Sequence, residues 1–399
     1  MRLDPHSFAL AALLTALVAA APLSTDMYLP ALPAIGAYFS VGTADVQMTL
    51  SVYLAGFAFA QLVVGPLSDR FGRRPVLVGG MAVFVVTSIA CALSDSIVVL
   101  TVFRFFQAVG ACAGGAVGRA VVRDIHSPKE GARLLAHMGT AMAIGPLVAP
   151  LIGGQLTAAF GWSANFWALA AFGLVLFVIA GATLPETHAR PDVNALSLRR
   201  MGANYKTLLT DRPFQLFVLT NGFSFGGLFA FISGSSFVLI EVLGLSAQTF
   251  GFAFSFGVIG YMIGTQVSAR LVKTFGLERL IGIGGRIGLV AGVAGVACVT
   301  LFPPTIPGIV GPMFFYALSV GFIMPNSMAG SLAPYPHMAG AASALMGFIQ
   351  MSMASIFGAL VGVFYDGTAV PMMGMIAICG ICASIFAHIT SKGVLVAEE

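Results

Sequence analysis

Residues 46–94 read VQMTLSVYLAGFAFAQLVVGPLSDRFGRRPVLVGGMAVFVVTSIACALS. Two apolar runs, 46–66 and 75–94, lie on either side of a short charged loop. Each run is about 20 residues long, which is the length that an α-helix needs to cross the hydrocarbon core of a bilayer. This stretch therefore predicts two membrane-spanning helices joined by a short polar turn.

The same alternation of apolar run and short polar connector continues along the whole chain. It predicts twelve spans, at 8–30, 46–66, 75–94, 97–118, 134–157, 163–184, 213–238, 247–269, 280–301, 307–330, 338–362 and 370–390. Only 9% of the residues are charged, against about 25% in soluble domains. This composition excludes a soluble globular protein. The net charge of +4 is spread over short loops, so it does not indicate nucleic-acid binding.

The one long connector, 185–212, is expected to be a cytoplasmic linker that divides the chain into two halves, 1–184 and 213–399, with six spans each. The sequence also echoes itself across this division. SDR at 68–70 follows the second span and SAR at 268–270 follows the eighth, and a Phe-Gly pair comes soon after each. The echo predicts two pseudo-symmetric six-helix bundles, a design in which transporters bind substrate near the midplane between the repeats.

The basic residues give a separate test of the span count. The chain has 19 Lys and Arg residues, and all except Arg104 and Arg286 fall on the side that holds both termini in the twelve-span arrangement. Positive residues are concentrated in cytoplasmic loops. The pattern therefore predicts a multi-pass protein with both termini in the cytoplasm. Arg286 lies near the end of its span, and its long side chain is expected to reach the interface.

Several motifs resemble those of the major facilitator superfamily. GPLSDRFGRRP at 65–75 is similar to that superfamily's loop between spans 2 and 3, RFFQAVG at 104–110 to its span-4 motif, and GPLVAPLIGG at 145–154 to the span-5 motif of its antiporters. LSTDMYLPALP at 23–33 and LPET at 184–187 resemble the Bcr/CflA drug-resistance branch. The resemblance implies the all-α, twelve-helix major facilitator fold and a drug/proton antiporter.

The resemblance assigns a gating role to the loop between spans 2 and 3, at Gly65, Asp69, Arg70, Gly72, Arg73 and Arg74. Gly65 allows the second span to approach a neighbour closely. Asp69 is expected to dock at the partly positive N-terminus of the eleventh span, a contact of about 0.3–1 kcal/mol, and so to latch the cytoplasmic gate. For Arg73 and Arg74 an equal alternative is that they only follow the positive-inside pattern.

The span-5 motif consists of Gly145, Pro146, Pro150, Gly153 and Gly154. Proline in a membrane helix removes backbone hydrogen bonds and allows bending. The resemblance implies a kinked gating helix that limits proton leak and favours export. Ordinary glycine-mediated packing between the halves is the alternative.

Asp26 is the only acidic residue deep within a predicted span, where charges are costly and usually functional. It lies roughly 27 Å along an outward-running span, and Arg104 lies roughly 10 Å below the outer surface on an inward-running one. The two are therefore expected to lie close together and to couple transport to protons, because protonation of Asp26 would release Arg104. A static salt bridge is the structural alternative.

The candidate substrate-binding residues are polar or aromatic side chains within spans: Tyr28, Tyr53, Asn221, Phe225 and Asn326. Aromatic surfaces suit apolar or cationic compounds. Most of the 33 Phe residues are nevertheless expected to contact lipid.

Neither a metal, a cofactor nor an enzyme is indicated. The five Cys lie in apolar runs, and the six His form no HExxH or clustered pattern. The leading hypothesis is a monomeric, proton-driven exporter of drugs or other small organic molecules in the bacterial inner membrane. The alternatives are a proton-coupled carrier of a specific natural metabolite and an integral-membrane enzyme.

Overall fold

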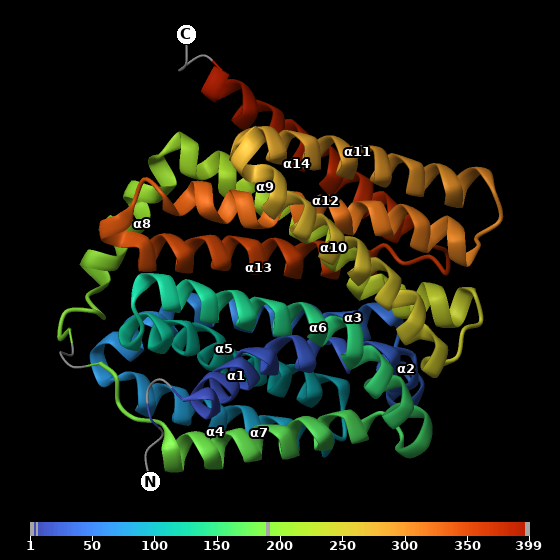
Figure 1. Cartoon of the computed structure of the whole chain (residues 1–399). Helices are drawn as coiled ribbons and strands as arrows, with labels where there is room; N and C mark the ends of the chain where they lie inside the picture. Colours follow the sequence, from blue (N-terminus) through green and yellow to red (C-terminus); the bar gives the residue numbers. More distant parts are fainter. Residues whose placement is uncertain (1–3, 5–6, 189–191, 396–399) are drawn as a thin grey trace.

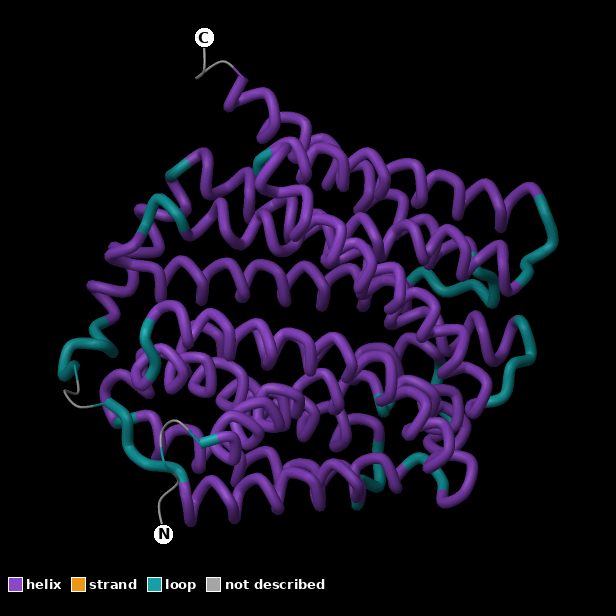
Figure 2. The backbone as a smooth tube through the Cα atoms, viewed as in Figure 1, coloured by secondary structure: helices purple, strands orange, loops and turns teal. Residues whose placement is uncertain are grey.

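The computed structural model describes residues 4, 7–188 and 192–395, and over these residues the chain is helical and contains no strand (Figure 2). Eleven helices in this part of the chain are long and apolar enough to cross a membrane. Helix α6, Pro128–Phe160, adds a twelfth, and its described apolar part is Ile144–Phe160. The expected all-α, twelve-helix architecture is confirmed.

The helices form two groups that lie side by side (Figure 1). The first contains α1 (Phe8–Asp26), η1 (Leu29–Ala31), α2 (Leu32–Phe39), α3 (Thr43–Phe71), α4 (Arg73–Ala92), α5 (Ile97–Ile125), α6 (Pro128–Phe160) and α7 (Ser163–Thr183). The second contains α9 (Arg212–Ser236), the π-helical η2 (Phe237–Val242), α10 (Ala247–Phe275), α11 (Leu277–Leu301), α12 (Ile306–Leu332), η3 (Pro336–Met338), α13 (Ala339–Val363) and α14 (Val370–Leu395). An additional helix, α8 (Leu198–Thr210), lies in the connector. We call these groups the first and second halves.

The sequence echo corresponds to a structural repeat. Helices α3 and α10 each have 29 residues, and each is followed by a glycine with a positive φ, +98° at Gly72 and +76° at Gly276. A residue with a Cβ adopts such a backbone conformation only at a steric cost. The same turn therefore joins α3 to α4 in the first half and α10 to α11 in the second.

The first span is longer than expected, and it is broken. Helix α1 ends at Asp26, and after the η1 turn the chain resumes as α2 and continues to Phe39. Pro30 and Pro33 lack backbone N–H groups, so an uninterrupted hydrogen-bond ladder cannot form here. The expected end at residue 30 is wrong, because the prolines interrupt the helix without ending the span. Discontinuous helices of this kind are typical of the midplane sites of transporters.

Two faces of the bundle are useful as landmarks. The linker face carries α8 and the 65–75 loop, and α1 begins and α14 ends there (Figure 1). The opposite face carries the short connections at residues 40–42, 93–96 and 161–162.

The halves are joined in the part nearer the opposite face. Three serines of the second half donate hydrogen bonds to backbone carbonyls of the first: Ser236 to Leu29 (2.6 Å), Ser255 to Leu147 (3.0 Å) and Ser355 to Ser51 (2.7 Å). Glycines allow the backbones to approach closely at the same level. A side chain at Gly154 would collide with the carbonyl of Ala247 on α10. The structure is therefore closed at the opposite face.

Toward the linker face, Gln61 on α3 still packs against Gly347 on α13, and the packing opens one turn further along α3. Gly65 on α3 and Gly139 on α6 have no atom of the described residues within 4 Å of the position that a Cβ would take. The side chain of Asp69, at the end of α3, is 44% exposed. The two halves therefore meet at one face and diverge toward the other.

A first prediction concerns this closure. Gly154→Ala places a methyl group against the Ala247 carbonyl, and such overpacking costs about 1–3 kcal/mol. We expect a roughly five- to hundredfold shift toward conformers that are open at the opposite face. Spin labels at the exposed residues Asp45 and Thr249 will report this shift as longer inter-half distances.

The matched control is Gly139→Ala on the same helix, where the new methyl group meets open space. Both substitutions change helix propensity equally, so they differ only in the contact they create. Identical distance distributions for the two variants would contradict the proposed role of Gly154.

Candidate functional site

The guanidinium of Arg104, on α5, is fully buried in the first half. Its Nη1 donates to the Ser24 carbonyl (3.1 Å), to Ser24 Oγ (3.2 Å) and to Gln107 Oε1 (2.7 Å). Its central carbon lies 4.2 Å from the ring centre of Tyr53 and 4.6 Å from that of Tyr28. Cation–π contacts contribute about 2 kcal/mol or more when desolvated, so the two rings stabilise the buried charge.

Gln107 extends this polar cluster away from α1. Its Nε2 donates to Ser88 Oγ (2.8 Å), and Ser88 in turn donates to the Phe84 carbonyl on α4. The Nε and Nη2 atoms of Arg104 have no hydrogen-bond partner in the described part of the chain. Because an unpaired buried donor is costly, these two N–H groups are available to water or to a ligand oxygen.

Asp26 is buried, with 4% of its surface exposed, and its carboxylate accepts a hydrogen bond from Thr25 Oγ1 (3.0 Å). The expected ion pair with Arg104 is not formed within 4 Å in the described structure. Arg104 does reach the same layer of α1, but it binds Ser24. Two residues differ by about 200° around a helix, so Ser24 and Asp26 point to opposite sides. The two residues therefore reach the same layer of the first half without an ion pair between them in this conformation, and their role in proton coupling stays a prediction.

Asp26 instead shares a helix face with Pro22, four residues earlier. The Pro22 ring lies 3.6 Å from the position that a Cβ on Gly145 would take, and the backbone of Met27 packs against Gly153. Both glycines are on α6, which contacts α10 of the second half. By helical periodicity the carboxyl group of Asp26 lies on the Pro22 side of α1, and it also acts electrostatically on Tyr53 of α3.

The span-5 motif lies along this boundary. Gly145 and Gly153 face α1, whereas Gly154 faces α10. Pro146 and Pro150 are inside α6, which remains helical from Pro128 to Phe160. The motif therefore provides close packing on both sides of α6, and its role in proton leak stays a prediction.

The candidate substrate residues fall into three environments. Tyr28 and Tyr53 are buried against Arg104, and Tyr28 also shares a 2.5 Å hydrogen bond with Thr49. Phe225 is half-buried on α9, with its ring centre 4.8 Å from that of Phe229. The first two residues belong to the Arg104 cluster, and contact of any of these rings with substrate stays a prediction.

Two candidate amides lie in the second half. Asn221 is buried on α9, and its Oδ1 has no hydrogen-bond partner among the described residues. Asn326 on α12 donates from Nδ2 to Ser268 Oγ (2.7 Å) and to the Phe322 carbonyl (2.6 Å). Asn326 therefore joins α12 to α10, whereas Asn221 retains an acceptor that a ligand can use.

Arg73 is the centre of the gating loop. Its guanidinium is largely buried and binds Asp69 (2.5 Å), Asp124 (2.9 Å) and Ser68 Oγ (2.6 Å). Arg73 thus ties the end of α3 and the end of α5 to the start of α4. Such a set of contacts is more than adherence to the positive-inside pattern.

The neighbouring arginines are less constrained. Arg74 Nη2 donates to the Gly181 carbonyl on α7 (2.6 Å). Arg70 is exposed and lies 5.3 Å from the centre of the Phe71 ring. Arg74 therefore fixes α7, whereas Arg70 remains available at the surface.

The expected contact of Asp69 with the N-terminus of the eleventh span is not formed between the described residues. The Asp69 carboxylate binds Arg73 in its own half, and its backbone carbonyl accepts from Asp192 N in the connector (2.9 Å). The reason is the divergence of the halves at this face, which separates the loop from α13. The latch by Asp69 stays a prediction for a conformation in which the linker face is closed.

Glu186 is a loop partner that the sequence did not reveal as such. Its carboxylate accepts from Arg73 N (2.9 Å) and Arg74 N (3.1 Å), and so caps the N-terminus of α4. Gly72 is the residue that precedes α4, and it has no side chain that could cap the helix. A Cβ at Gly72 would collide with Glu186. The available signal was the LPET string at 184–187, together with the need of α4 for an external cap.

The surroundings of Glu186 also affect its ionisation. Partial burial raises the pKa of its carboxyl group, but the backbone N–H groups of His188, Arg73, Arg74 and Thr187 outweigh this and hold the pKa below the usual range. Hydrogen bonds to a charged form favour that form. Glu186 is therefore a fixed anion at the linker face.

A family model described as Major Facilitator Superfamily matches residues 14–359. The chain belongs to the major facilitator superfamily. An uncharacterized MFS-type transporter, YdgK, of Bacillus subtilis is 33% identical over 94% of each chain. The bicyclomycin resistance protein homolog of Haemophilus influenzae is 30% identical over 92% of each chain. These findings agree with the Bcr/CflA drug-resistance branch.

Solved structures support the same fold. The xylose transporter XylE from E. coli, in a partially occluded inward-open conformation, gives a TM-score of 0.72 at 14% identity, and 95% of this chain and 96% of that chain are covered. This chain is accordingly a multi-pass membrane transporter of the major facilitator superfamily and not an enzyme.

A second prediction concerns Glu186. Glu186→Gln removes the negative charge from the α4 cap and will destabilise the folded protein by about 0.5–2 kcal/mol at pH 7. Because the folded-state pKa is depressed, the stabilisation is present above the ordinary glutamate pKa, about 4.3, and is lost as the pH falls through the lower folded value. Thermal unfolding in detergent as a function of pH measures both effects.

The control is Asp95→Asn, which removes an exposed carboxylate at the opposite face. It should unfold like the native protein at every pH. If Glu186→Gln remains less stable than the native protein by the same amount at pH values well below 4, the lost stability is not electrostatic.

Proposed function

We propose that this chain is a proton-driven exporter of small organic molecules. The observation that carries the proposal is the position of Asp26, a buried carboxyl group at the break of the first span, one turn after Pro22, which packs near Gly145 of α6. A proton-binding group at the boundary between two moving halves is exposed alternately to each side of the membrane as they rock. A single chain contains both halves, so a monomer is sufficient.

The direction of the cycle depends on orientation. The connections of the opposite face contain no Lys or Arg, whereas the linker-face loops hold nearly all of them. By the positive-inside rule the linker face lies in the cytoplasm of a bacterial inner membrane, together with both termini. The present conformation is then the one that opens toward the cytoplasm.

The proposed cycle uses this conformation for loading. Asp26 releases its proton toward the cytoplasm and substrate enters between the halves. The halves then rock, the opposite face opens, substrate leaves, and a new proton binds Asp26 from outside. Neutralising a carboxylate lowers the cost of burying it. Protonated Asp26 therefore favours the return to the conformation that opens at the linker face.

The energies are compatible with this cycle. One charge moving through 100 mV supplies about 2.3 kcal/mol, which is roughly a fiftyfold gradient. The three serine bonds that close the opposite face contribute about 0.5–1.5 kcal/mol each, because each is a neutral hydrogen bond. Breaking these three hydrogen bonds therefore costs an amount comparable with the energy that one proton delivers.

Arg104 acts indirectly in this proposal. Its charge is held by Ser24, Gln107 and two tyrosine rings, so protonation of Asp26 breaks no direct ion pair. The cation instead fixes the layer of α1 that precedes the break. Its Nε and Nη2 atoms are unpaired in the described part of the chain, and they are donors that a buried water molecule can satisfy.

Drugs are the substrate class that we favour. Relatives of this chain are named a bicyclomycin resistance protein homolog and multidrug resistance protein MdtL of E. coli, the latter 28% identical over 95% of this chain. Helix α9 contributes half-buried Phe223 and Phe225 together with the free acceptor of Asn221. Such a surface suits apolar or cationic molecules.

A third prediction tests coupling. Everted membrane vesicles expressing the chain will release protons when chloramphenicol-like compounds or cationic dyes are added, and Asp26→Asn will abolish this release. Asn matches Asp in size but cannot carry the proton. Fluorescence of a pH-sensitive dye inside the vesicles provides the measurement.

The matched control is Asp45→Asn, an exposed acid on α3. Full substrate-induced proton movement in Asp26→Asn would disprove the coupling role of Asp26. A response to amino acids or another metabolite, and to none of the drugs, would replace multidrug export with a dedicated metabolite carrier and leave the mechanism intact.

A fourth prediction concerns Arg104. Arg104→Lys keeps the charge but loses the planar guanidinium, which stacks between two rings while its Nη1 binds Ser24 and Gln107. We expect efflux to fall at least tenfold at equal expression. Arg199→Lys, at an exposed position of α8, is the control and should transport normally.

A further inference from the structure

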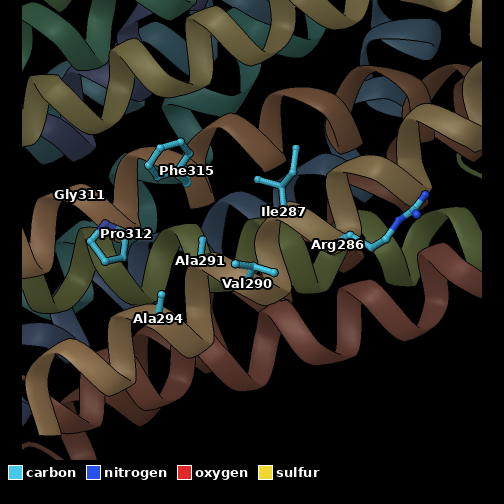
Figure 3. A pocket seen from close by; sticks show the side chains of 8 residues that line it. All are labelled: Arg286, Ile287, Val290, Ala291, Ala294, Gly311, Pro312 and Phe315. Carbon is cyan, nitrogen blue, oxygen red and sulfur yellow. The ribbon is translucent and has the colours of Figure 1, made fainter. Parts of the chain in front are cut away.

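Helices α11 and α12 enclose a groove of about 640 Å³ away from the inter-half interface (Figure 3). Six of its lining residues define it: Arg286, Val290 and Ala294 from α11, and Gly311, Pro312 and Phe315 from α12. All of these except Arg286 are apolar. The volume is within the range of small-molecule sites, about 300–1,000 Å³.

The groove is on the periphery of the bundle. Helix α11 packs against α12 and α14, and α12 packs against α10 and α9 on its other sides. Val290 and Phe315 are 67% and 56% exposed although they are large and apolar. In a membrane-spanning helix such a surface contacts lipid, so the groove opens to the bilayer and not to the transport path.

Arg286 is the one charged residue among the residues that line the groove, and its side chain is exposed. Its Nε donates to the Gly282 carbonyl one turn earlier (3.2 Å), so the guanidinium is directed toward the linker face. Figure 3 shows this side chain extending away from Val290 and Ala294. The described structure gives no partner for its two Nη atoms.

We propose that this groove binds one anionic phospholipid, with its phosphate at Arg286 and an acyl chain along α11 and α12. Arginine recognises phosphate by paired N–H···O bonds. From Arg286 to Ala294 the groove extends about 12 Å, at 1.5 Å per residue. One leaflet of the hydrocarbon core is about 15 Å deep, so the apolar part matches most of one acyl chain.

Two further observations favour this occupant. Gly311 has open space where a side chain would lie, so no side chain obstructs an acyl chain at that position of the groove. Lys273 and Arg279 are exposed near the same end of α11, and Glu278 alone offsets them there. Basic sites between helices at the cytoplasmic side select anionic headgroups.

The test is native mass spectrometry of the delipidated, detergent-purified protein with added phosphatidylglycerol or zwitterionic phosphatidylethanolamine. We expect one phosphatidylglycerol molecule per chain, bound at least tenfold more tightly than phosphatidylethanolamine. Arg286→Gln will weaken phosphatidylglycerol binding about tenfold, whereas Arg286→Lys will restore part of it. Arg199→Gln removes a charge from exposed α8 and should have no effect.

A second variant separates the acyl chain from the headgroup. Gly311→Leu fills the groove and leaves Arg286 unchanged, so it should also weaken retention of the lipid. Equal binding of phosphatidylglycerol by the native chain, Arg286→Gln and Gly311→Leu would overturn the proposal. So would equal binding of the anionic and zwitterionic lipids, because it would indicate a non-selective lipid annulus.

If either variant is poorly folded, a third measurement decides. Phe315→Trp places a fluorophore in the groove, and brominated phosphatidylglycerol should quench it at a lower mole fraction than brominated phosphatidylethanolamine does. Quenching that follows bulk mole fraction for both lipids would equally overturn the proposal.

Discussion

The break in the first span, between Asp26 and Leu32, is the feature on which the rest of the structure depends. The Leu29 carbonyl, at the start of the η1 turn, accepts the backbone N–H of Leu32 and also the hydroxyl of Ser236 from the other half. The same break ends α1 at a carboxyl group and brings the Met27 backbone against Gly153. In an apolar medium every backbone group needs a partner within the protein, so non-helical backbone is tolerated only where it packs on protein or lines a cavity. The break therefore both closes the opposite face and locates the acid.

Polar contacts inside a half differ in strength from those between halves. Arg104 and Arg73 each join two or more helices of the first half through charge-assisted hydrogen bonds, which are roughly twice as strong as neutral ones. The hydrogen bonds that cross between the described halves are neutral bonds from serine to carbonyl. This difference favours movement of each half as a unit. Rocking of one half against the other is then the motion of lowest cost, which is the motion that alternating access requires.

The sequence predicts the spans, the two halves and the depth of Arg104, because these follow from run length, charge placement and rise per residue. It does not predict the direction of Asp26 around α1, since the helix break falls at that residue and two positions differ by about 200°. It also does not reveal that Glu186 caps α4, because that contact joins residues far apart in the chain. The partner of Asp69 differs from expectation for another reason. The partner of Asp69 depends on which of two conformations the halves adopt, and one sequence is compatible with both conformations.

The gating loop illustrates how one set of residues can serve two conformations. With the halves apart at the linker face, the Asp69 carboxylate binds Arg73 and is still 44% exposed. A carboxylate can accept about four hydrogen bonds, so Asp69 can keep Arg73 and add the N–H groups at the start of α13 when that face closes. Arg73 is held independently by Asp124, and α4 is held by Glu186. We propose that the first half presents the same anion in both arrangements, so that closing needs no rearrangement of the loop. The 65–75 loop would then be formed before the linker face closes, and only the new contacts to α13 would stabilise the closed conformation.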